Sequence, residues 1–202
     1  MNAQSLGSLR TGWTATLDDC ALSGGWTSEG NEFAVVDAAG GVSVFDGKRG
    51  DLIWEKNVHD GGALATSVHP SKRKFATTGQ DGRLIIWNLL EPDTEKIIDI
   101  GKGWVENVSW SPDGNFVAAS LSKTVFTYSS SGEEIWRTSD HQSTVSTIAW
   151  TNKGELATAC YGQVQFLDGV SGNLIQKLEW KGSLLSIALS SDSDVVACGS
   201  QD

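Results

Sequence analysis

The chain has 202 residues, of which 39% are hydrophobic and 20% charged, with 23 Gly, 3 Pro and 3 Cys. This balance is typical of a globular protein and argues against a disordered chain or a disulfide scaffold. Lys and Arg number 15 against 25 Asp and Glu, and the net charge of −10 repels phosphate backbones and anionic membranes. We therefore expect no nucleic-acid or membrane partner. Residues 1–16 show no signal-peptide pattern, so we expect a cytoplasmic protein.

The chain begins with one predicted strand and then repeats a longer pattern. Residues 9–17 resemble the fourth strand of a later repeat. From Ala21 onward, a segment of alternating apolar residues, a polar turn and a second apolar segment recur five times. The copies begin at residues 21, 63, 105, 145 and 184, which are 42, 42, 40 and 39 residues apart. A period of about 40 residues is that of a four-stranded propeller blade.

Each of the first four copies continues with further β-rich segments. The third segments are 42–45, 84–87, 125–128 and 164–167, and fourth segments include 51–55, 133–137 and 173–178. Four short strands joined by tight turns predict an antiparallel sheet. Both faces of such a sheet are apolar at alternate positions, so each sheet needs a neighbour on either side. The sequence therefore predicts an all-β propeller in which the sheets stack radially.

The repeats divide the chain into blades. We expect residues 1–20 to supply the closing strand of the last blade, and the blades to span 21–62, 63–104, 105–144, 145–183 and, as a first half only, 184–202. A seven-bladed ring needs about seven such repeats. We therefore expect a fragment of a longer protein, although two copies completing each other, or a smaller ring, are alternatives. The open edge at 195–198 is expected to be able to self-associate.

The second repeat carries a distinctive set of polar residues. His59 precedes the strand that starts at Ala63, the sequence ATTGQDG spans 76–82, and Trp87 follows. With these residues the chain resembles the WD40 repeat family of β-propellers, over residues 21–202. The resemblance implies a buried, structural hydrogen-bond relay through His59, Thr77, Asp81 and Trp87, with Thr78 as the alternative hydroxyl. The Trp-Asp dipeptide that names the family is absent, and the other repeats lack the full relay set.

Other conspicuous residues receive structural interpretations. Trp26, Trp110 and Trp150 recur at the ends of first strands, which predicts core positions. His69 lies in a His-Pro-Ser turn, where we expect a solvated side chain. The three Cys form no CxxC pair, and no GxSxG, phosphate-binding loop or HExxH pattern occurs. We therefore predict no catalytic residues, no metal site and no cofactor.

The loops that enter the first strands and the turns between the second and third strands are the predicted docking face. Rigid sheets would hold these loops in a ring and present a preformed surface to a protein or peptide partner. Trp104 is the principal candidate, because Trp is over-represented among binding hot spots, and the alternative is that Trp104 packs into its own blade. The candidate residues are Trp104, Glu106, Gln80, Ser146, Leu185 and Gln201. We expect a non-catalytic interaction scaffold. The alternatives are a propeller-based enzyme with an axial active site completed by further blades, and a purely structural assembly role.

Overall fold

Four four-stranded antiparallel sheets make up the computed structural model, which describes residues 12–139 and 141–201. All the strands except β14 and β15 have four to six residues, as expected from the short apolar segments of the sequence. The first sheet contains β1 (Ala21–Trp26), β2 (Glu32–Asp37), β3 (Gly41–Asp46) and β4 (Leu52–Asn57). The second contains β5 (Ala63–Val68), β6 (Lys74–Gly79), β7 (Arg83–Asn88) and β8 (Lys96–Asp99), with the short 3-10 helix η1 (Pro92–Thr94) before β8.

The last two sheets differ in how their strands are divided. The third contains β9 (Val105–Trp110), β10 (Phe116–Leu121), β11 (Thr124–Ser129) and β12 (Glu134–Thr138). The fourth contains β13 (Thr147–Trp150), β14 (Glu155–Asp168), β15 (Leu174–Leu189) and β16 (Val196–Ser200). No helix of the described residues is long and apolar enough to cross a membrane.

Strands β14 and β15 each pair with one strand over their first half and with another over their second half. The first half of β14 pairs with β13 and its second half with β15, and the chain passes Gly162 at φ +82° between the halves. Beyond Gly182, residues 184–189 of β15 pair with β16. The half-repeat expected at 184–202 is therefore joined to the fourth sheet through a continuous strand.

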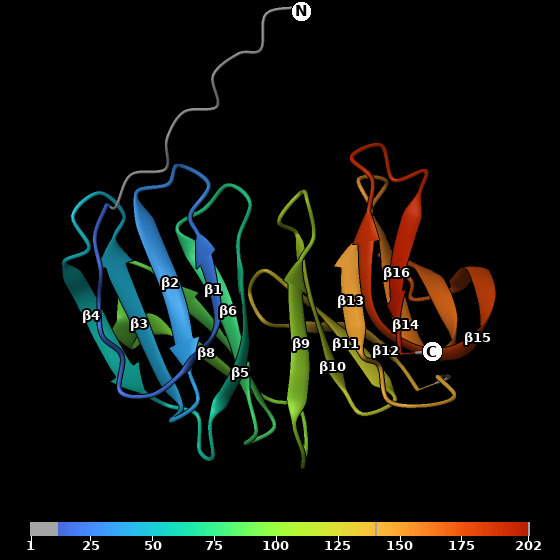
Figure 1. The fold of residues 1–202 in the computed structure, drawn as a ribbon, viewed down its shortest axis with the longest axis horizontal. Coiled ribbons are helices and arrows are strands. Elements are labelled where there is room, and N and C mark those ends of the chain that lie inside the picture. Colours follow the sequence, from blue (N-terminus) through green and yellow to red (C-terminus); the bar gives the residue numbers. More distant parts are fainter. Residues whose placement is uncertain (1–11, 140, 202) are drawn as a thin grey trace, which may run out of the picture.

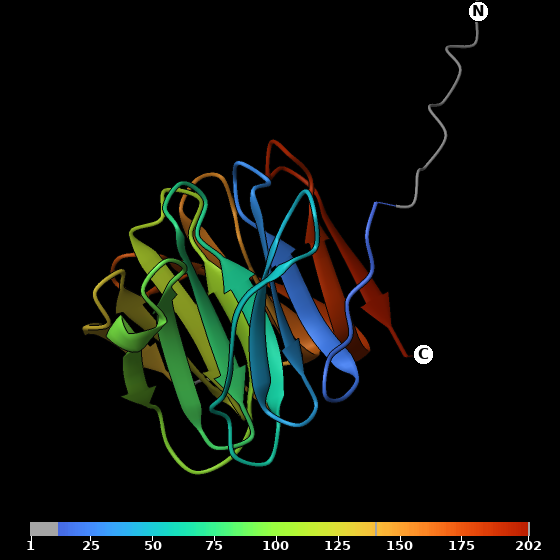
Figure 2. The same cartoon turned by 90° about the vertical axis from the view of Figure 1, so that its left-hand side faces the viewer.

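The sheets follow one another in an open arc, with β1–β4 at one end, β9 near the middle and β14–β16 at the other end (Figure 1). The view turned by 90° shows the sheets stacked face against face (Figure 2). Each pair of neighbouring sheets encloses its own core. Phe75 packs with the first sheet, whereas the next residue, Ala76, packs with the third. The third and fourth sheets enclose another cluster that includes Val125 and Leu156. The all-β propeller architecture predicted from the repeats is thus confirmed.

Indole groups join neighbouring sheets at their outer ends. The Trp54 indole Nε1–H on β4 donates to the carbonyl oxygen of Leu89 in the second sheet at 2.9 Å. Trp136 on β12 donates in the same way to Gly169 in the fourth sheet, also at 2.9 Å. Trp13 donates to Gly47 at 3.0 Å, so it occupies the place of a fourth-strand Trp.

The predicted N-terminal strand is not formed over residues 12–20, and residues 1–11 lie outside the described part of the chain. The Trp13 ring packs against Trp26, Phe33 and Phe45 and so attaches this segment to the first sheet. The core prediction for Trp26 is also wrong. Trp110 and Trp150 are 6% and 9% exposed between two sheets, whereas Trp26 is 51% exposed and contacts Trp13 and Phe33.

Four buried side chains of the second repeat form a continuous hydrogen-bond chain. Trp87 Nε1–H donates to Thr77 Oγ1 at 2.9 Å, and Thr77 Oγ1 lies 2.9 Å from His59 Nε2. His59 Nδ1 lies 3.1 Å from Asp81 Oδ1. The donors and acceptors are all satisfied if the Thr77 hydroxyl donates to His59 Nε2 and His59 Nδ1–H donates to the Asp81 carboxylate. This chain of hydrogen bonds ties the loop before β5 to the β6–β7 turn.

A shorter version of this brace occurs in the fourth sheet. His141 Nε2 lies 2.8 Å from Thr158 Oγ1, and His141 Nδ1 lies 3.1 Å from the carbonyl oxygen of Lys123 in the third sheet. Thr158 follows Ala157 in β14 as Thr77 follows Ala76 in β6. A backbone carbonyl oxygen therefore takes the part that the Asp81 carboxylate has in the second repeat, and no acidic turn residue is needed.

His69 is buried, so the expectation of a solvated turn residue is wrong. His69 is 1% exposed, and its imidazole packs against the Trp110 ring with the two ring centroids 4.8 Å apart. The backbone N–H groups of Ser71 and Lys72 donate to Nδ1, and Nε2 lies 3.0 Å from the carbonyl oxygen of Gly114. The neutral Nε2–H tautomer satisfies all three contacts.

Close packing between sheets makes Gly172 a sensitive position. Gly172 has φ +71°, and a Cβ there would lie 2.6 Å from the Trp136 ring, whereas Gly154 has φ +81° with no atom within 4 Å of a Cβ. Both Ala variants should pay the left-handed backbone cost of about 1–2 kcal/mol. Gly172→Ala should lose at least about 1 kcal/mol more, from overpacking. Urea unfolding measures the free energy of unfolding of both variants. Equal losses would show that the contact between Gly172 and Trp136 is loosely packed.

Thr77 and Thr78 form a matched pair for testing the hydrogen-bond chain. Thr77→Val leaves Trp87 Nε1 and His59 Nε2 buried without partners, so the free energy of unfolding should fall by about 2–5 kcal/mol. Thr78 is equally buried, but its Oγ1 has no hydrogen-bond partner. Thr78→Val should be neutral within about 0.5 kcal/mol or stabilising. Similar losses in both variants by denaturant unfolding would contradict this assignment.

Stability should decrease in mild acid. Burial lowers the pKa of His69, and likewise that of His59, below the ordinary value of 6.5. Below about pH 6.5 the unfolded chain binds protons at these histidines that the folded chain does not. The free energy of unfolding is therefore largest above about pH 6.5 and decreases as the pH falls below that value. Urea titrations at about pH 7.5 and about pH 5.5 should show this loss, and it should be smaller in His69→Asn. An unchanged pH slope in the variant would exclude His69 as a source.

Candidate functional site

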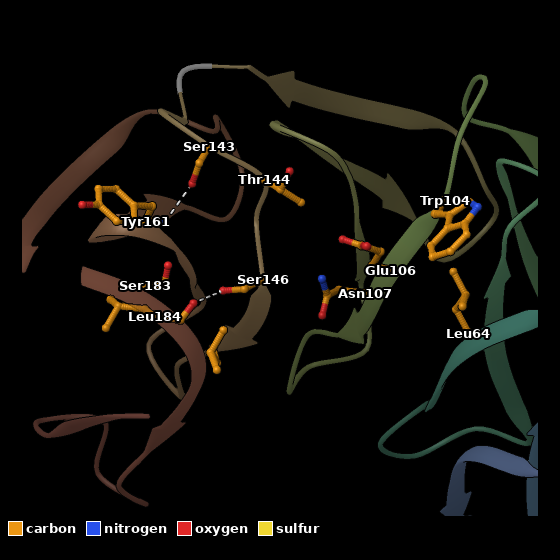
Figure 3. Close-up of a pocket in the computed structure, with 11 residues that line it drawn as sticks. Leu64, Trp104, Glu106, Asn107, Ser143, Thr144, Ser146, Tyr161, Ser183 and Leu184 are labelled. Carbon is orange, nitrogen blue, oxygen red and sulfur yellow. Dashed lines mark hydrogen bonds between the residues drawn. The ribbon is translucent and has the colours of Figure 1, made fainter. Parts of the chain in front are cut away.

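A pocket of about 640 Å³ opens where the first strands of successive sheets begin (Figure 3). It receives side chains from β5, β9, β14 and β15 and from the segment before β13. Because these elements belong to different sheets, the inter-sheet packing described above sets the pocket's shape. The pocket is lined by Leu64, Trp104, Glu106, Asn107, Ser143, Thr144, Ser146, Tyr161, Ser183, Leu184 and Leu185.

Trp104 is the largest side chain on the rim and is 55% exposed. Its loop is held against the β6–β7 turn, because the backbone N–H of Ile100 donates to the carbonyl oxygen of Gly82 at 2.9 Å. Gly82 has φ +78°, and a Cβ there would overlap the carbonyl oxygen of Gly101. The indole lies beside Leu64 on one side of the pocket, with Tyr161 on the opposite side (Figure 3). Tyr161 is 56% exposed.

Glu106 supplies the pocket's one charge. The second residue of each first-strand segment is Leu22, Leu64, Ser146 or Leu185 in the other repeats, so a carboxylate here departs from the repeat. Glu106 is exposed, and among the described residues no Lys, Arg or His forms an ion pair with it. Lys102 lines an adjoining hollow of about 200 Å³ with Trp104 and Glu106. The carboxylate is thus available to a cationic group.

Asn107 joins the third sheet to the segment before β13, and Ser146 joins that segment to β15 within the fourth sheet. Asn107 Nδ2 donates to Ser120 Oγ at 2.9 Å and to the carbonyl oxygen of Val145 at 3.2 Å. The Ser146 hydroxyl lies 2.6 Å from the carbonyl oxygen of Leu184, to which it donates. These bonds fix the spacing of the elements around the pocket. Ser146, predicted to contact a partner, is half-buried and engaged in this way.

The structure brings four of the six predicted docking residues together. Trp104, Glu106, Ser146 and Leu185 line the pocket, whereas Gln80 and Gln201 do not. The Gln80 backbone N–H donates to Gly62, at the junction of the first two sheets, and that of Gln201 donates to Ser183.

Asn107 and Tyr161 were missed as pocket residues. The alternation of β9 gave no signal for Asn107, because it places Asn107 on the face of the buried Val105 and not on that of Glu106. Tyr161 stands in the turn beside Gly162, where nothing in the repeat pattern marks an aromatic residue.

The hydrogen-bond chain of His59, Thr77, Asp81 and Trp87 lies outside this pocket. Its members are buried and hold a loop in place. Within residues 12–139 and 141–201, no group of three or more His, Cys, Asp and Glu side chains is placed to hold a metal ion. The pocket therefore offers an aromatic, apolar and singly charged surface for binding.

The family model described as "WD domain, G-beta repeat" matches residues 50–88 and 96–129. These segments run from β4 through β7 and from β8 through β11. Each matched repeat therefore joins the last strand of one sheet to three strands of the next. This offset links successive sheets through the chain itself.

Curated relatives share parts of this chain. A "p21-activated protein kinase-interacting protein 1-like" of Danio rerio is 31% identical over 112 residues, covering 55% of this chain and 28% of that protein. A "Guanine nucleotide-binding protein subunit beta" of Nicotiana plumbaginifolia is 35% identical over 60 residues, covering 30% of this chain and 16% of that protein. The chain thus spans less than a third of either relative.

A solved structure matches most of the chain. A chain in the "Crystal Structure of Mitotic Checkpoint Complex" superposes with a TM-score of 0.81 at 15% identity, over 89% of this chain and 57% of that chain. At this identity the likeness shows the fold, a WD40 propeller. The chain thus contains two consecutive repeats that match the WD40 family model, and it has the fold of a WD40 propeller.

Proposed function

We propose that this chain is a non-catalytic interaction scaffold that docks a protein or peptide partner at the pocket containing Trp104 and Glu106. The observation that supports it most strongly is a 55% exposed indole beside an unpaired carboxylate, in a pocket whose wall is held by hydrogen bonds of Asn107 and Ser146. Rigid loops lose little conformational entropy on binding, which favours recognition at a preformed surface. By their names, the relatives include a kinase-interacting protein and G-protein subunits, and WD40 propellers generally serve as interaction scaffolds.

The chemistry of the pocket favours a partner that presents a basic side chain. The face of Trp104 can receive a Lys or Arg cation, and the Glu106 carboxylate can form a charge-assisted hydrogen bond with it. Leu64 and Leu185 offer apolar contact to the stem of such a side chain. The net charge of −10 further favours a basic partner over a nucleic acid.

Replacing Trp104 should weaken peptide binding strongly. Peptides selected from a random library for binding to the 202-residue chain should be enriched in Lys and Arg. Trp104→Ala should raise their dissociation constants about 30-fold, since a hot-spot aromatic contributes at least about 2 kcal/mol. Fluorescence anisotropy with labelled peptides measures this. Glu106→Gln should weaken the same peptides less at high salt than at low salt, because screening weakens exposed charge pairs.

Trp26→Ala is the matched control, because Trp26 is 51% exposed and does not line the pocket. Its peptide affinity should equal that of the unmodified chain. If folded Trp104→Ala binds the selected peptides as tightly as Trp26→Ala does, the docking site lies elsewhere on the molecule.

A further inference from the structure

A separate cavity of about 250 Å³ lies between the third and fourth sheets. Thr138 lines it from β12, Gln163 and Gln165 from β14, and Leu174 and Lys177 from β15, with Gln142 also at the wall. Its polar lining is therefore dominated by side-chain amides. Such a lining contrasts with the apolar clusters that fill the other spaces between sheets.

Gln163 is buried without any hydrogen-bond partner. The residue is 1% exposed, and both its Oε1 and its Nε2 are shielded from solvent with no hydrogen-bond partner among the residues that the structure describes. A buried amide whose donor and acceptor are both unpaired costs free energy, and native proteins keep few of them. Gln165 beside it is 6% exposed.

The repeat does not require an amide at this position. Counted from the last residue of each third strand, Gln163 corresponds to Gly41 in β3, Arg83 in β7 and Thr124 in β11. The four sheets thus have four different residues at this one position of the third strand. Packing within the sheet does not account for a glutamine whose amide is left unpaired.

The two unpaired atoms define the chemistry of a matching ligand. A carboxylate would accept from Nε2 but would place negative charge against Oε1, and an ammonium group would do the reverse. A carboxamide presents one donor and one acceptor side by side and can satisfy both. The one cation in the lining, Lys177, lies 3.3 Å from Glu179 Oε1 and is thereby partly neutralised. The cavity therefore favours an uncharged amide over an ion.

A groove adjoins both this cavity and the pocket containing Trp104. This open groove of about 500 Å³ shares Gln142 and Lys177 with the cavity, and shares Tyr161 with that pocket. Trp180, 60% exposed, lines the groove between them. An extended segment seated over Tyr161 would thus pass the mouth of the cavity.

We propose that this cavity is a carboxamide subsite, which binds the side chain of an Asn or Gln residue through Gln163. Its use by a docked partner segment rests on the proposed function, whereas its preference for an amide can be tested without any partner. Because both atoms are shielded in the unliganded chain, binding would turn the Gln163 side chain toward the cavity, where the ligand amide donates to Oε1 and accepts from Nε2.

Three small probes test this chemistry on the 202-residue chain. Propionamide carries the side chain of Gln, propionate that of Glu, and propylamine supplies a cation of similar size. In two-dimensional nitrogen–proton NMR spectra, propionamide should shift the side-chain NH₂ signals of Gln163 along a saturating curve in the millimolar range. Propionate and propylamine should give no saturating shift of those signals.

Gln163→Met, of similar volume, should weaken propionamide binding at least about tenfold, read from backbone amides of β14. Gln176→Met, an exposed position on β15, is the matched control and should leave it unchanged. No saturating shift by propionamide in the unmodified chain would mean that the cavity holds water only and would overturn the proposal, as would equal saturation by propionate. Neither result bears on the Trp104 pocket, and the unmodified chain decides the matter even where Gln163→Met fails to fold.

Discussion

Packing of each sheet against a neighbour on both of its faces is the interaction on which the rest of this structure depends. Alternate residues of one strand enter different cores, as Phe75 and Ala76 do in β6. A sheet that buries side chains on both faces cannot be stable alone, so the second and third sheets are held from either side. The indole bonds of Trp54 and Trp136 then set how neighbouring sheets are aligned at their outer ends. The pocket inherits this rigidity because its wall is assembled from several sheets.

The sheet architecture could be predicted because the repeat carries it in period-two patterning and spacing, signals that are local and occur several times. His69 could not be placed in the same way, because its burial depends on Gly114 in another sheet, and a His-Pro-Ser turn looks solvated in isolation. Trp26 shows the converse. Its position in the repeat is that of Trp110 and Trp150, but burial requires a neighbouring sheet, and the only described chain on that side is the segment holding Trp13.

The candidate site was predictable where loop position alone decides it. Trp104 and Glu106 precede or begin a first strand, and the ring of loops puts such residues on one surface. Gln80 and Gln201 belong to turns that lie beyond the pocket, and only the distances between sheets show this. Tyr161 was missed because its contribution depends on how β14 passes through Gly162 without a break, a local geometry that the sequence pattern of the other repeats does not contain.

Departures from the repeat separate the binding features from the scaffold. Positions shared by several repeats hold the sheets together, as the indoles of β4 and β12 do. Glu106 stands where three other repeats have Leu, and Gln163 stands where they have Gly, Arg or Thr. Neither residue improves the stability of its sheet, since one carries an unpaired charge and the other an unpaired buried amide. Residues that break a structural pattern and line neighbouring hollows are those expected to meet a ligand.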